Sequence, residues 1–268
     1  MSYNSHQRPL TVVDQIDRRV IVPFPPLRIV SLVPSQTELL VDLGLSKQLV
    51  GVTKFCIHPE NVRHEAKVVG GTKNFDFVKI AACQPDLIIG NKEENYQDGI
   101  EKLAAKYPVW MSNISDLGDA LRMIKQVGLI TGKVHMAEPL AAEIEQSFDT
   151  LAALAAETAP VSVAYFIWRK PYMVAATGTF IDDMLHRAGF TNAFAGLSRY
   201  PEISAEQLAA AAPQRIFLSS EPYPFAAKHV AEFQALCPAA KIEIVDGELF
   251  SWYGSRLRHS AAYFSQLR

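Results

Sequence analysis

The sequence predicts an α/β protein with two parallel-sheet lobes of Rossmann type, joined by one long backbone helix. Short apolar runs alternate with amphipathic segments in both halves of the chain, which is typical of parallel strands covered by helices. The plan of a helix, a proline and a short apolar strand occurs twice, as VKIAACQPDLIIGNKE and as EQLAAAAPQRIFLSSEP. One long amphipathic stretch lies between the two halves. These observations predict lobes at 1–132 and 160–268 with a linking helix at 133–159.

The linking helix is predicted between Glu138 and Thr158. Its apolar residues step by three or four, as in a helix with one buried face: Leu140, Ile144, Phe148, Leu151 and Leu154. Pro139 suits the first helical turn, and Pro160 ends the segment. At 1.5 Å per residue, about 20 helical residues span about 30 Å, which is long enough to connect two lobes.

The first lobe begins with a hairpin at 11–25, followed by a buried strand at 28–33. The next segment reads as a helix that Ser35 or Thr37 caps and Gly44 ends. Further strands are predicted at 49–55, 85–91 and 108–113, further helices at 78–84, 95–107 and 117–133, and a long loop at 57–77. The second lobe has strands predicted at 161–168, 214–220 and 241–246 and helices at 179–189, 204–212, 230–237 and 255–267.

Composition excludes several classes of function. The formal net charge is −2 and the chain has no block of Lys or Arg, which argues against nucleic acid or an anionic membrane as partner. No apolar run reaches the roughly 18 residues that a membrane-spanning helix needs. The N-terminal residues have no apolar signal core, so we expect a cytoplasmic protein or one whose signal has been removed. The 3 cysteines are widely spaced and suit reduced thiols.

Candidate binding residues follow the predicted strands, because ligands of open α/β sheets bind outside the carboxyl ends of the strands. Aromatic side chains in these turns suit a bulky and partly planar ligand, and neighbouring cations suit its carboxylates or phosphates. The predicted ligand-binding residues are Ser35, Gln36, Phe55, His58, Lys73, Asn91, Lys92, Trp168, Tyr172, Arg199, Tyr200, Trp252 and Tyr253. We expect Phe55, Trp168 and at least one of Trp252 and Tyr253 to face one another across a single cleft.

A metal site and a catalytic site are both weakly indicated. Cys56 and His58 are metal-ligating types, but no second pair stands at a spacing that completes a tetrahedral site, so we predict no protein-bound metal. The chain has no G-x-S-x-G, G-x-G-x-x-G after a strand, or H-E-x-x-H motif. We therefore expect no catalytic residues and no covalently bound cofactor.

Several quoted segments, in order, resemble the helical-backbone class of substrate-binding proteins of ABC transporters, and within it the cobalamin-binding branch. They are RIVSLVPSQTELLVDLGL, VGVTKFCIHP, KIAACQPDLIIGNKEEN and SRYPEISAEQLAAAAPQRIFLSS. The resemblance implies a non-catalytic receptor that holds a metal chelate between two lobes. The ligand would be a corrinoid, an iron–siderophore or haem, and would contain cobalt or iron. It also implies an ABC permease as partner, a periplasmic or cell-surface location and a monomer.

The resemblance assigns roles to particular positions. Phe55 matches the aromatic residue that packs on the corrin ring in the first lobe, and Trp168 matches the second-lobe aromatic. Asn91 stands where the cobalamin binders have tryptophan. Glu206 matches the second-lobe glutamate that docks on the permease, and the first-lobe position falls near Val78.

Two alternatives remain open at this stage. The first is an enzyme on a related two-lobed scaffold, such as a metal chelatase in which His58 and Glu93 or Glu94 handle protons. The second is a cytoplasmic chelate-binding protein that works without a transporter.

Overall fold

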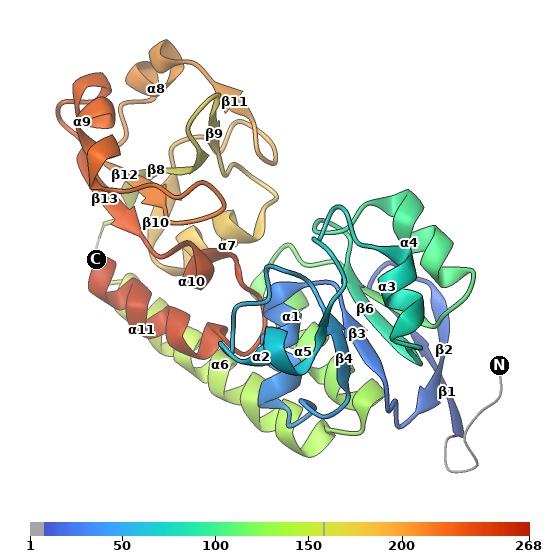
Figure 1. The fold of residues 1–268 in the computed structure, drawn as a ribbon. Coiled ribbons are helices and arrows are strands. Elements are labelled where there is room, and N and C mark those ends of the chain that lie inside the picture. Colours follow the sequence, from blue (N-terminus) through green and yellow to red (C-terminus); the bar gives the residue numbers. More distant parts are fainter. Residues whose placement is uncertain (1–7, 158) are drawn as a thin grey trace. The chain divides into compact units, whose positions relative to one another are not determined.

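The computed structural model describes residues 8–157 and 159–268, which form two compact α/β units (Figure 1). The first unit contains the described residues up to Ile114, with Gly118–Glu143 and Tyr253–Arg256. The second contains Ser115–Leu117, Ile144–Trp252 and Leu257–Arg268. Both units have the predicted α/β architecture. Among the described residues, no helix combines the length and apolarity needed to cross a membrane.

The first unit is built on a five-stranded sheet. Its elements are β1 (Arg8–Val13), β2 (Arg19–Phe24), β3 (Ile29–Ser31), α1 (Pro34–Asp42), β4 (Leu49–Val52), α2 (Val62–Glu65), β5 (Lys67–Val68), α3 (Phe77–Ala82), β6 (Leu87–Asn91), α4 (Gln97–Ala104), β7 (Val109–Ser112) and α5 (Leu117–Thr131). The strand order is β5-β4-β3-β6-β7, and every pair is parallel, as predicted. All carboxyl ends of these strands therefore lie at one edge of the sheet.

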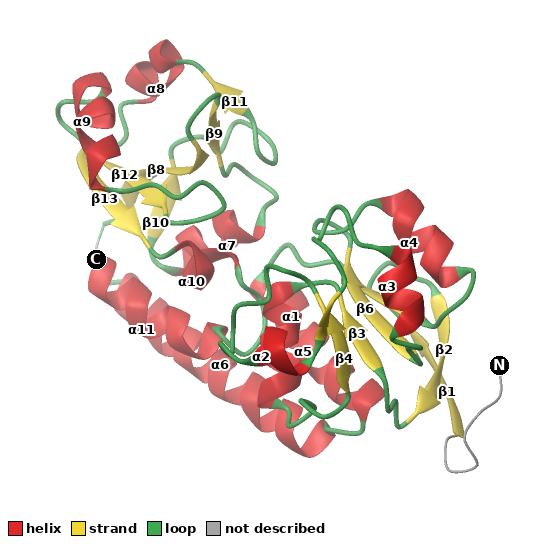
Figure 2. Ribbon diagram, in the orientation of Figure 1, coloured by secondary structure: helices red, strands yellow, loops and turns green. Residues whose placement is uncertain are grey.

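Alternate residues of the strands face opposite helical layers. Val30, Ile88 and Met111 pack with Ile80 of α3 and Leu103 of α4 in one buried cluster. The intervening strand residues point to the other face, where α1 and α5 lie in Figure 2. Burial on both faces explains why these strands read as continuous apolar runs.

The hairpin predicted at 11–25 forms from β1 and β2, which pair antiparallel. Asp14 is buried at its turn, where its carboxylate accepts hydrogen bonds from the backbone N–H groups of Ile16 and Arg18 at 3.1 and 2.8 Å. The Arg18 guanidinium donates to the same carboxylate at 2.8 and 3.0 Å. Met111 N–H in β7 donates to it at 3.3 Å, so Asp14 also ties the hairpin to the sheet.

The long helix is α6 (Val134–Ala155), which begins four residues before the predicted start. Gly132, at φ +73°, separates it from α5. Pro139 lies inside α6 and not in its first turn, because the preceding residues are already helical. The predicted face is buried at Leu140 through Leu151, whereas Leu154 is exposed. The predicted end at Thr158 lies outside the described residues, as do residues 1–7.

The start of α1 differs from the prediction. Val33 is the N-cap and Pro34 is the first helical residue, so Ser35 and Thr37 lie within the helix and do not cap it. Thr37 Oγ1 instead donates to Val33 O at 3.0 Å. The loop predicted at 57–77 contains the short elements α2 and β5, which are too brief to leave a periodic signal.

The second unit is built on a mixed sheet. Its elements, after the end of α6, are β8 (Val161–Trp168), β9 (Tyr172–Val174), α7 (Phe180–Arg187), β10 (Phe190–Asn192), β11 (Glu202–Ile203), α8 (Ala205–Ala211), β12 (Arg215–Ser219), α9 (Ala227–Leu236), β13 (Lys241–Val245), α10 (Gly247–Ser251) and α11 (Leu257–Leu267). The order is β11-β9-β8-β12-β13, with β10 also pairing with β8. β8 is parallel to β10 and β12, and β12 to β13.

β9 departs from the parallel arrangement because it pairs antiparallel with β8. Only residues 169–171 connect the two strands, and a parallel connection needs a crossover of a dozen residues or more. β9 was not predicted, because its three residues follow Pro171 directly and carry no periodic signal. The resulting hairpin places Trp168 and Tyr172 at its tip.

Each face of this sheet is covered by an aromatic cluster. On one face, Phe166 and Ile216 pack with Leu208 of α8 and Phe233 of α9. On the other, Tyr165 lies 5.0 Å from Phe250 of α10, measured between ring centroids. The ring of Phe250 in turn packs against that of Phe264 of α11, with 4.4 Å between centroids and 37° between the ring planes. Because these clusters account for most of the large buried side chains of the unit, they fix the strands whose ends carry the candidate site.

Candidate functional site

A buried polar network holds the carboxyl edge of the first unit's sheet. Asn91 ends β6, and its Nδ2 donates to Ser112 Oγ at 2.9 Å. Its Oδ1 accepts from the backbone N–H groups of Glu93 and Glu94 at 2.8 and 3.1 Å. All the polar atoms of this side chain are therefore used within the protein. Asn91 therefore holds the backbone of the loop after β6 from the buried side of that loop.

Asn95 also holds backbone segments in place, after β3, after β5 and at the end of β6. Its Nδ2 donates to Leu32 O after β3 at 3.3 Å and to Thr72 O after β5 at 2.9 Å. Its Oδ1 accepts from Asn91 N–H at 2.9 Å. No local pattern in the sequence marks Asn95, because its partners lie 63 and 23 residues away along the chain.

Ser35 and Gln36 are buried in the first turn of α1. Gln36 has no solvent-exposed surface, and its Nε2 donates to Ser112 Oγ. Its Oε1 accepts no hydrogen bond from any described residue. An unsatisfied buried amide oxygen is costly, so it marks a place for an ordered water molecule or a ligand donor.

Phe55 is the prominent exposed aromatic of this edge. Its ring is 50% exposed and follows β4. Lys54 Nζ lies 4.9 Å from the ring centroid. The loop after β5 passes against the ring, since a Cβ added at Gly71 would lie 3.3 Å from Phe55 Cε2 and 2.3 Å from Asn74 Oδ1. The absence of a side chain at Gly71 therefore lets this loop approach the ring and the Asn74 side chain closely.

Lysines lie on the same loops, beside the carboxylates of Glu93 and Glu94. Lys73, two residues after Gly71, donates from Nζ to Glu93 O, and it thereby links the loops after β5 and β6. Lys92 is exposed on the second of these loops. The loops around Phe55 thus present an apolar ring bordered by positive charge. This combination suits a planar ligand that carries acidic groups.

Cys56 and His58 follow Phe55 but do not form a metal centre. Cys56 is fully buried, and the hydroxyls of Thr37 and Thr53 lie 3.1 and 3.2 Å from its Sγ. Burial raises the pKa of the Cys56 thiol above its ordinary value, despite these hydrogen bonds. His58 is half-buried on the same loop. Among the described residues, no group of three or more His, Cys, Asp or Glu side chains is placed to hold a metal ion.

Trp168 is the exposed aromatic at the carboxyl end of β8 in the second unit. Its side chain is 38% exposed, and its Nε1 donates to Lys170 O at 3.1 Å. The ring of Tyr223, in the loop after β12, contacts it edge-on at 5.5 Å between centroids. Tyr172 stands across the hairpin tip, half-buried. The indole is thus held on one side and open on another.

Trp252 and Tyr253 are both buried, unlike Phe55 and Trp168. Trp252 Nε1 donates to Glu221 Oε1 at 2.8 Å, and Ser251 Oγ donates to the same oxygen at 2.7 Å. Burial is the main cause that raises the pKa of Glu221, and the charges of Glu248 and Asp246 add to it against these two hydrogen bonds.

The segment Tyr253–Arg256 is anchored in the first unit. Arg256 donates to both oxygens of Glu38 on α1, at 2.9 and 2.7 Å. Gly254, at φ +141°, packs so closely that an added Cβ would lie 3.0 Å from Ser35 O. Tyr253 is therefore fixed next to the first turn of α1.

The remaining predicted residues lie elsewhere on the second unit. Arg199 has φ 64°, donates to Gly178 O at 2.7 Å and lies 5.5 Å from the ring of Tyr200. Glu206 is exposed in the first turn of α8, where a hydrogen bond with Ser204 lowers its pKa. The face-to-face arrangement of Phe55, Trp168 and Trp252 or Tyr253 stays a prediction.

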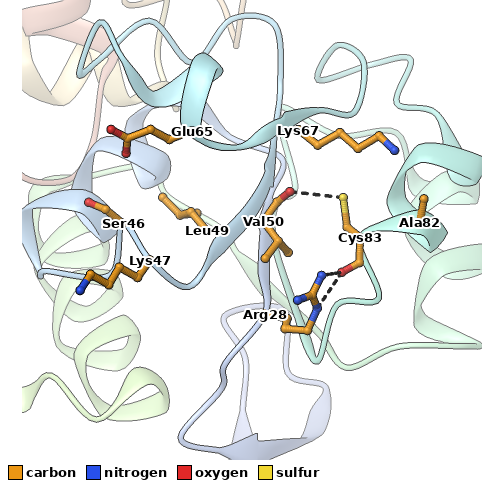
Figure 3. Close-up of a pocket in the computed structure, with 9 residues that line it drawn as sticks. All are labelled: Arg28, Ser46, Lys47, Leu49, Val50, Glu65, Lys67, Ala82 and Cys83. Atoms are coloured by element: carbon orange, nitrogen blue, oxygen red, sulfur yellow. Dashed lines mark hydrogen bonds between the residues drawn. The ribbon is translucent and has the colours of Figure 1, made fainter.

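One pocket of roughly 480 Å³ lies at the opposite, amino edge of the first unit's sheet (Figure 3). Arg28, Leu49 and Lys67 line it, and these residues precede or begin β3, β4 and β5. The Arg28 guanidinium donates to Cys83 O at 2.9 and 2.7 Å. Lys47 and Lys67 point away from each other, so the charges do not converge on one point. The pocket is separate from the candidate site.

The fold and the carboxyl edges of the two sheets define a class of protein. Two α/β units that share one long helix, each with an exposed aromatic at the carboxyl edge of its sheet, form a framework suited to a binding protein. A family model described as periplasmic binding protein matches residues 29–241. The chain belongs to this family.

Individual relatives agree with this assignment. The chain is 28% identical over 197 residues to a vitamin B12-binding protein of Vibrio campbellii, covering 73% of this chain and 71% of the relative. The crystal structure of the periplasmic vitamin B12 binding protein BtuF of Vibrio cholerae matches with a TM-score of 0.80 at 24% identity, over 91% of this chain and 97% of that one. A periplasmic haem-binding protein of Pseudomonas aeruginosa matches with a TM-score of 0.77 at 25% identity, over 90% and 92%.

Proposed function

We propose that the chain is a non-catalytic receptor for a metal chelate of the corrinoid, siderophore or haem class, and that it serves ABC-type uptake. The observation that carries the proposal is the exposed aromatic ring at the carboxyl edge of each sheet, Phe55 in the first unit and Trp168 in the second. Membership of a binding-protein family and relatives named for vitamin B12 and haem support the choice of ligand class.

The candidate residues divide into contact and supporting roles. We assign ligand contact to side chains with solvent exposure: Phe55, His58, Lys73, Lys92, Trp168, Tyr172, Arg199 and Tyr200. We assign support to the buried ones: Ser35, Gln36, Asn91, Trp252 and Tyr253. The cobalt or iron arrives within the chelate, so the protein needs no metal site of its own. The exposed Glu206 is the proposed contact for a permease, and the receptor works as a monomer whose lobes are 1–132 and 160–268.

A thermal-shift panel tests this function. Purified protein is heated alone and with cyanocobalamin, haemin or a ferric siderophore, with metal-free porphyrin as a chemical control. A ligand at 100 times its Kd stabilises the folded state by about 2.7 kcal/mol, which raises the Tm of a chain of this size by roughly 5–10 °C. We expect one chelate to produce this shift in the wild type and a smaller one in Phe55→Ala. No shift with any chelate would contradict the proposal.

A further inference from the structure

The tip of the β8–β9 hairpin, residues 168–172, is held by one carboxylate from α9. Glu232 lies on α9, 63 residues from Arg169. Its Oε2 accepts from Arg169 Nε at 2.8 Å and from Arg169 Nη2 at 2.7 Å. Its Oε1 accepts from the Tyr172 hydroxyl at 2.5 Å. Both ends of the tip are therefore bound to the same side chain, on either side of Lys170 and Pro171.

A second residue of α9 holds the ring that contacts Trp168. The buried His229 accepts a hydrogen bond at Nδ1 from Ala226 N–H at 3.0 Å, so its neutral ring carries the proton on Nε2. That nitrogen lies 3.3 Å from the Tyr223 hydroxyl and donates to it. His229 and Glu232 are three residues apart, which puts them on one face of the helix. This face therefore supports the indole of Trp168 through both the hairpin tip and Tyr223.

We propose that Glu232 is a positioning residue for ligand binding, which fixes the hairpin tip so that the exposed face of Trp168 is preorganised as a platform for the flat face of the chelate. The inference rests on the proposed function, because it needs Trp168 to contact ligand. Its physical reason is entropic: a bulky ring at the end of a strand, next to a three-residue turn, must be ordered on binding unless the protein has already ordered it. The half-buried Glu232 carboxylate orders the tip before the ligand arrives.

The charge state of the network agrees with the geometry. Partial burial would raise the pKa of Glu232, but hydrogen bonds from Arg169 and Tyr172 and the charges of Arg169 and Lys170 outweigh it and lower the pKa below its ordinary value. The pKa of Tyr172 is raised to about 12 by burial, by its hydrogen bond to Glu232 and by that residue's charge. Hydrogen bonds with Glu232 and Tyr223 raise the pKa of Arg169. At pH values near 7, Glu232 and Arg169 are thus both charged and form an ion pair, and the phenol of Tyr172 keeps its proton.

The first part of the test needs no ligand. The indole N–H signals of the three tryptophans are recorded by ¹⁵N–¹H NMR, and Trp168→Phe assigns the signal of Trp168. We expect Glu232→Ala to shift and broaden this signal and to speed amide hydrogen exchange across the tip. Glu232→Gln, which keeps the shape without the charge, should have a smaller effect. The matched control is Arg187→Gln, which removes another ion pair of 2.7 Å in the same unit, to Asp183. An unchanged Trp168 signal in Glu232→Ala would overturn the proposal.

The second part measures affinity by titration with cyanocobalamin and with haemin. We expect Glu232→Ala to weaken binding of the chelate that the wild type binds by roughly tenfold, about 1.4 kcal/mol, with Glu232→Gln between the two and Arg187→Gln unchanged. If Glu232→Ala loosens the hairpin tip but binds the chelate with wild-type affinity, the proposed role of Glu232 in binding is wrong. If the wild type binds neither cyanocobalamin nor haemin, a ferric siderophore is titrated in their place. Absence of binding there as well means that the proposed function fails, and the NMR result still decides whether Glu232 holds the tip. Thermal melts of all variants show whether a change in affinity comes from unfolding of the protein or from displacement of the hairpin tip.

Discussion

Replacing Phe55 by alanine tests the exposed aromatic of the first unit. A phenylalanine can bury about 150–250 Å², and half of this ring is exposed, so a covering ligand removes roughly 100 Å² of it from water. At about 25 cal/mol per Å² this contributes about 2.5 kcal/mol, or nearly a hundredfold in Kd. Because the residue is already half exposed in the ligand-free protein, we expect the fold to lose less than the complex does.

Calorimetric titration and thermal melts of the ligand-free variant measure the two effects separately. Phe77→Ala is the matched control, since Phe77 is an aromatic of the same unit, 37% exposed, and its ring contacts Phe75 edge-on at 5.5 Å. We expect Phe55→Ala to lose most of the affinity with a small change in Tm, and Phe77→Ala to bind normally. If Phe55→Ala melts many degrees lower and yet binds as the wild type does, the ring belongs to the core and the reasoning is wrong.

Three further predictions concern the framework. Asp14→Ala leaves the Arg18 guanidinium and three backbone donors, those of Ile16, Arg18 and Met111, without their buried acceptor, so we expect a loss of about 3 kcal/mol in urea unfolding, whereas the exposed Asp17→Ala should cost far less. The pKa of Glu221 is raised in the folded state, so the folded protein binds a proton at this residue more readily than the unfolded chain does. The free energy of unfolding therefore falls as pH rises from the unfolded pKa of Glu221 through its folded pKa. Glu221→Gln should therefore raise the Tm at pH 7 and give little gain at pH 4; an equal gain at both would refute the assignment. Gly254→Ala must adopt φ +141° against Ser35 O, and we expect a cost of about 1–3 kcal/mol, read from chemical denaturation.

Periodic segments of the sequence predicted the framework well. In the first unit, β3, β4, β6 and β7 were found because they lie in continuous apolar runs, and α6 was found because its apolar residues step by three or four over several turns. The start of α6 was misplaced because Pro139 reads as a first-turn residue, while the helix tolerates it further inside. Strands β5 and β9 were missed because two or three residues carry no period, and β9 depends on the tight turn before it.

The candidate site was less predictable because it is made by contacts between distant segments. Turns after strands drew attention to Phe55 and Trp168, and both are exposed there. The same rule chose Gln36 and Asn91, whose side chains are buried in a network with Ser112. No local pattern points to Glu232, since its role comes from partners 60 and 63 residues away. Spacing along the chain predicts which residues lie at the carboxyl edges of the sheets. It does not predict which of these side chains are exposed to a ligand and which are buried and support the loops.

The central claim is that the chain binds a metal chelate and leaves it unchanged. The most direct measurement titrates the purified protein with cyanocobalamin, haemin and a ferric siderophore in a calorimeter, followed by mass spectrometry of the ligand released from the complex. We predict saturable binding of one chelate class at one molecule per chain and recovery of that chelate with its metal in place. Absence of binding throughout the panel, or recovery of a chelate that has lost or exchanged its metal, would contradict the claim.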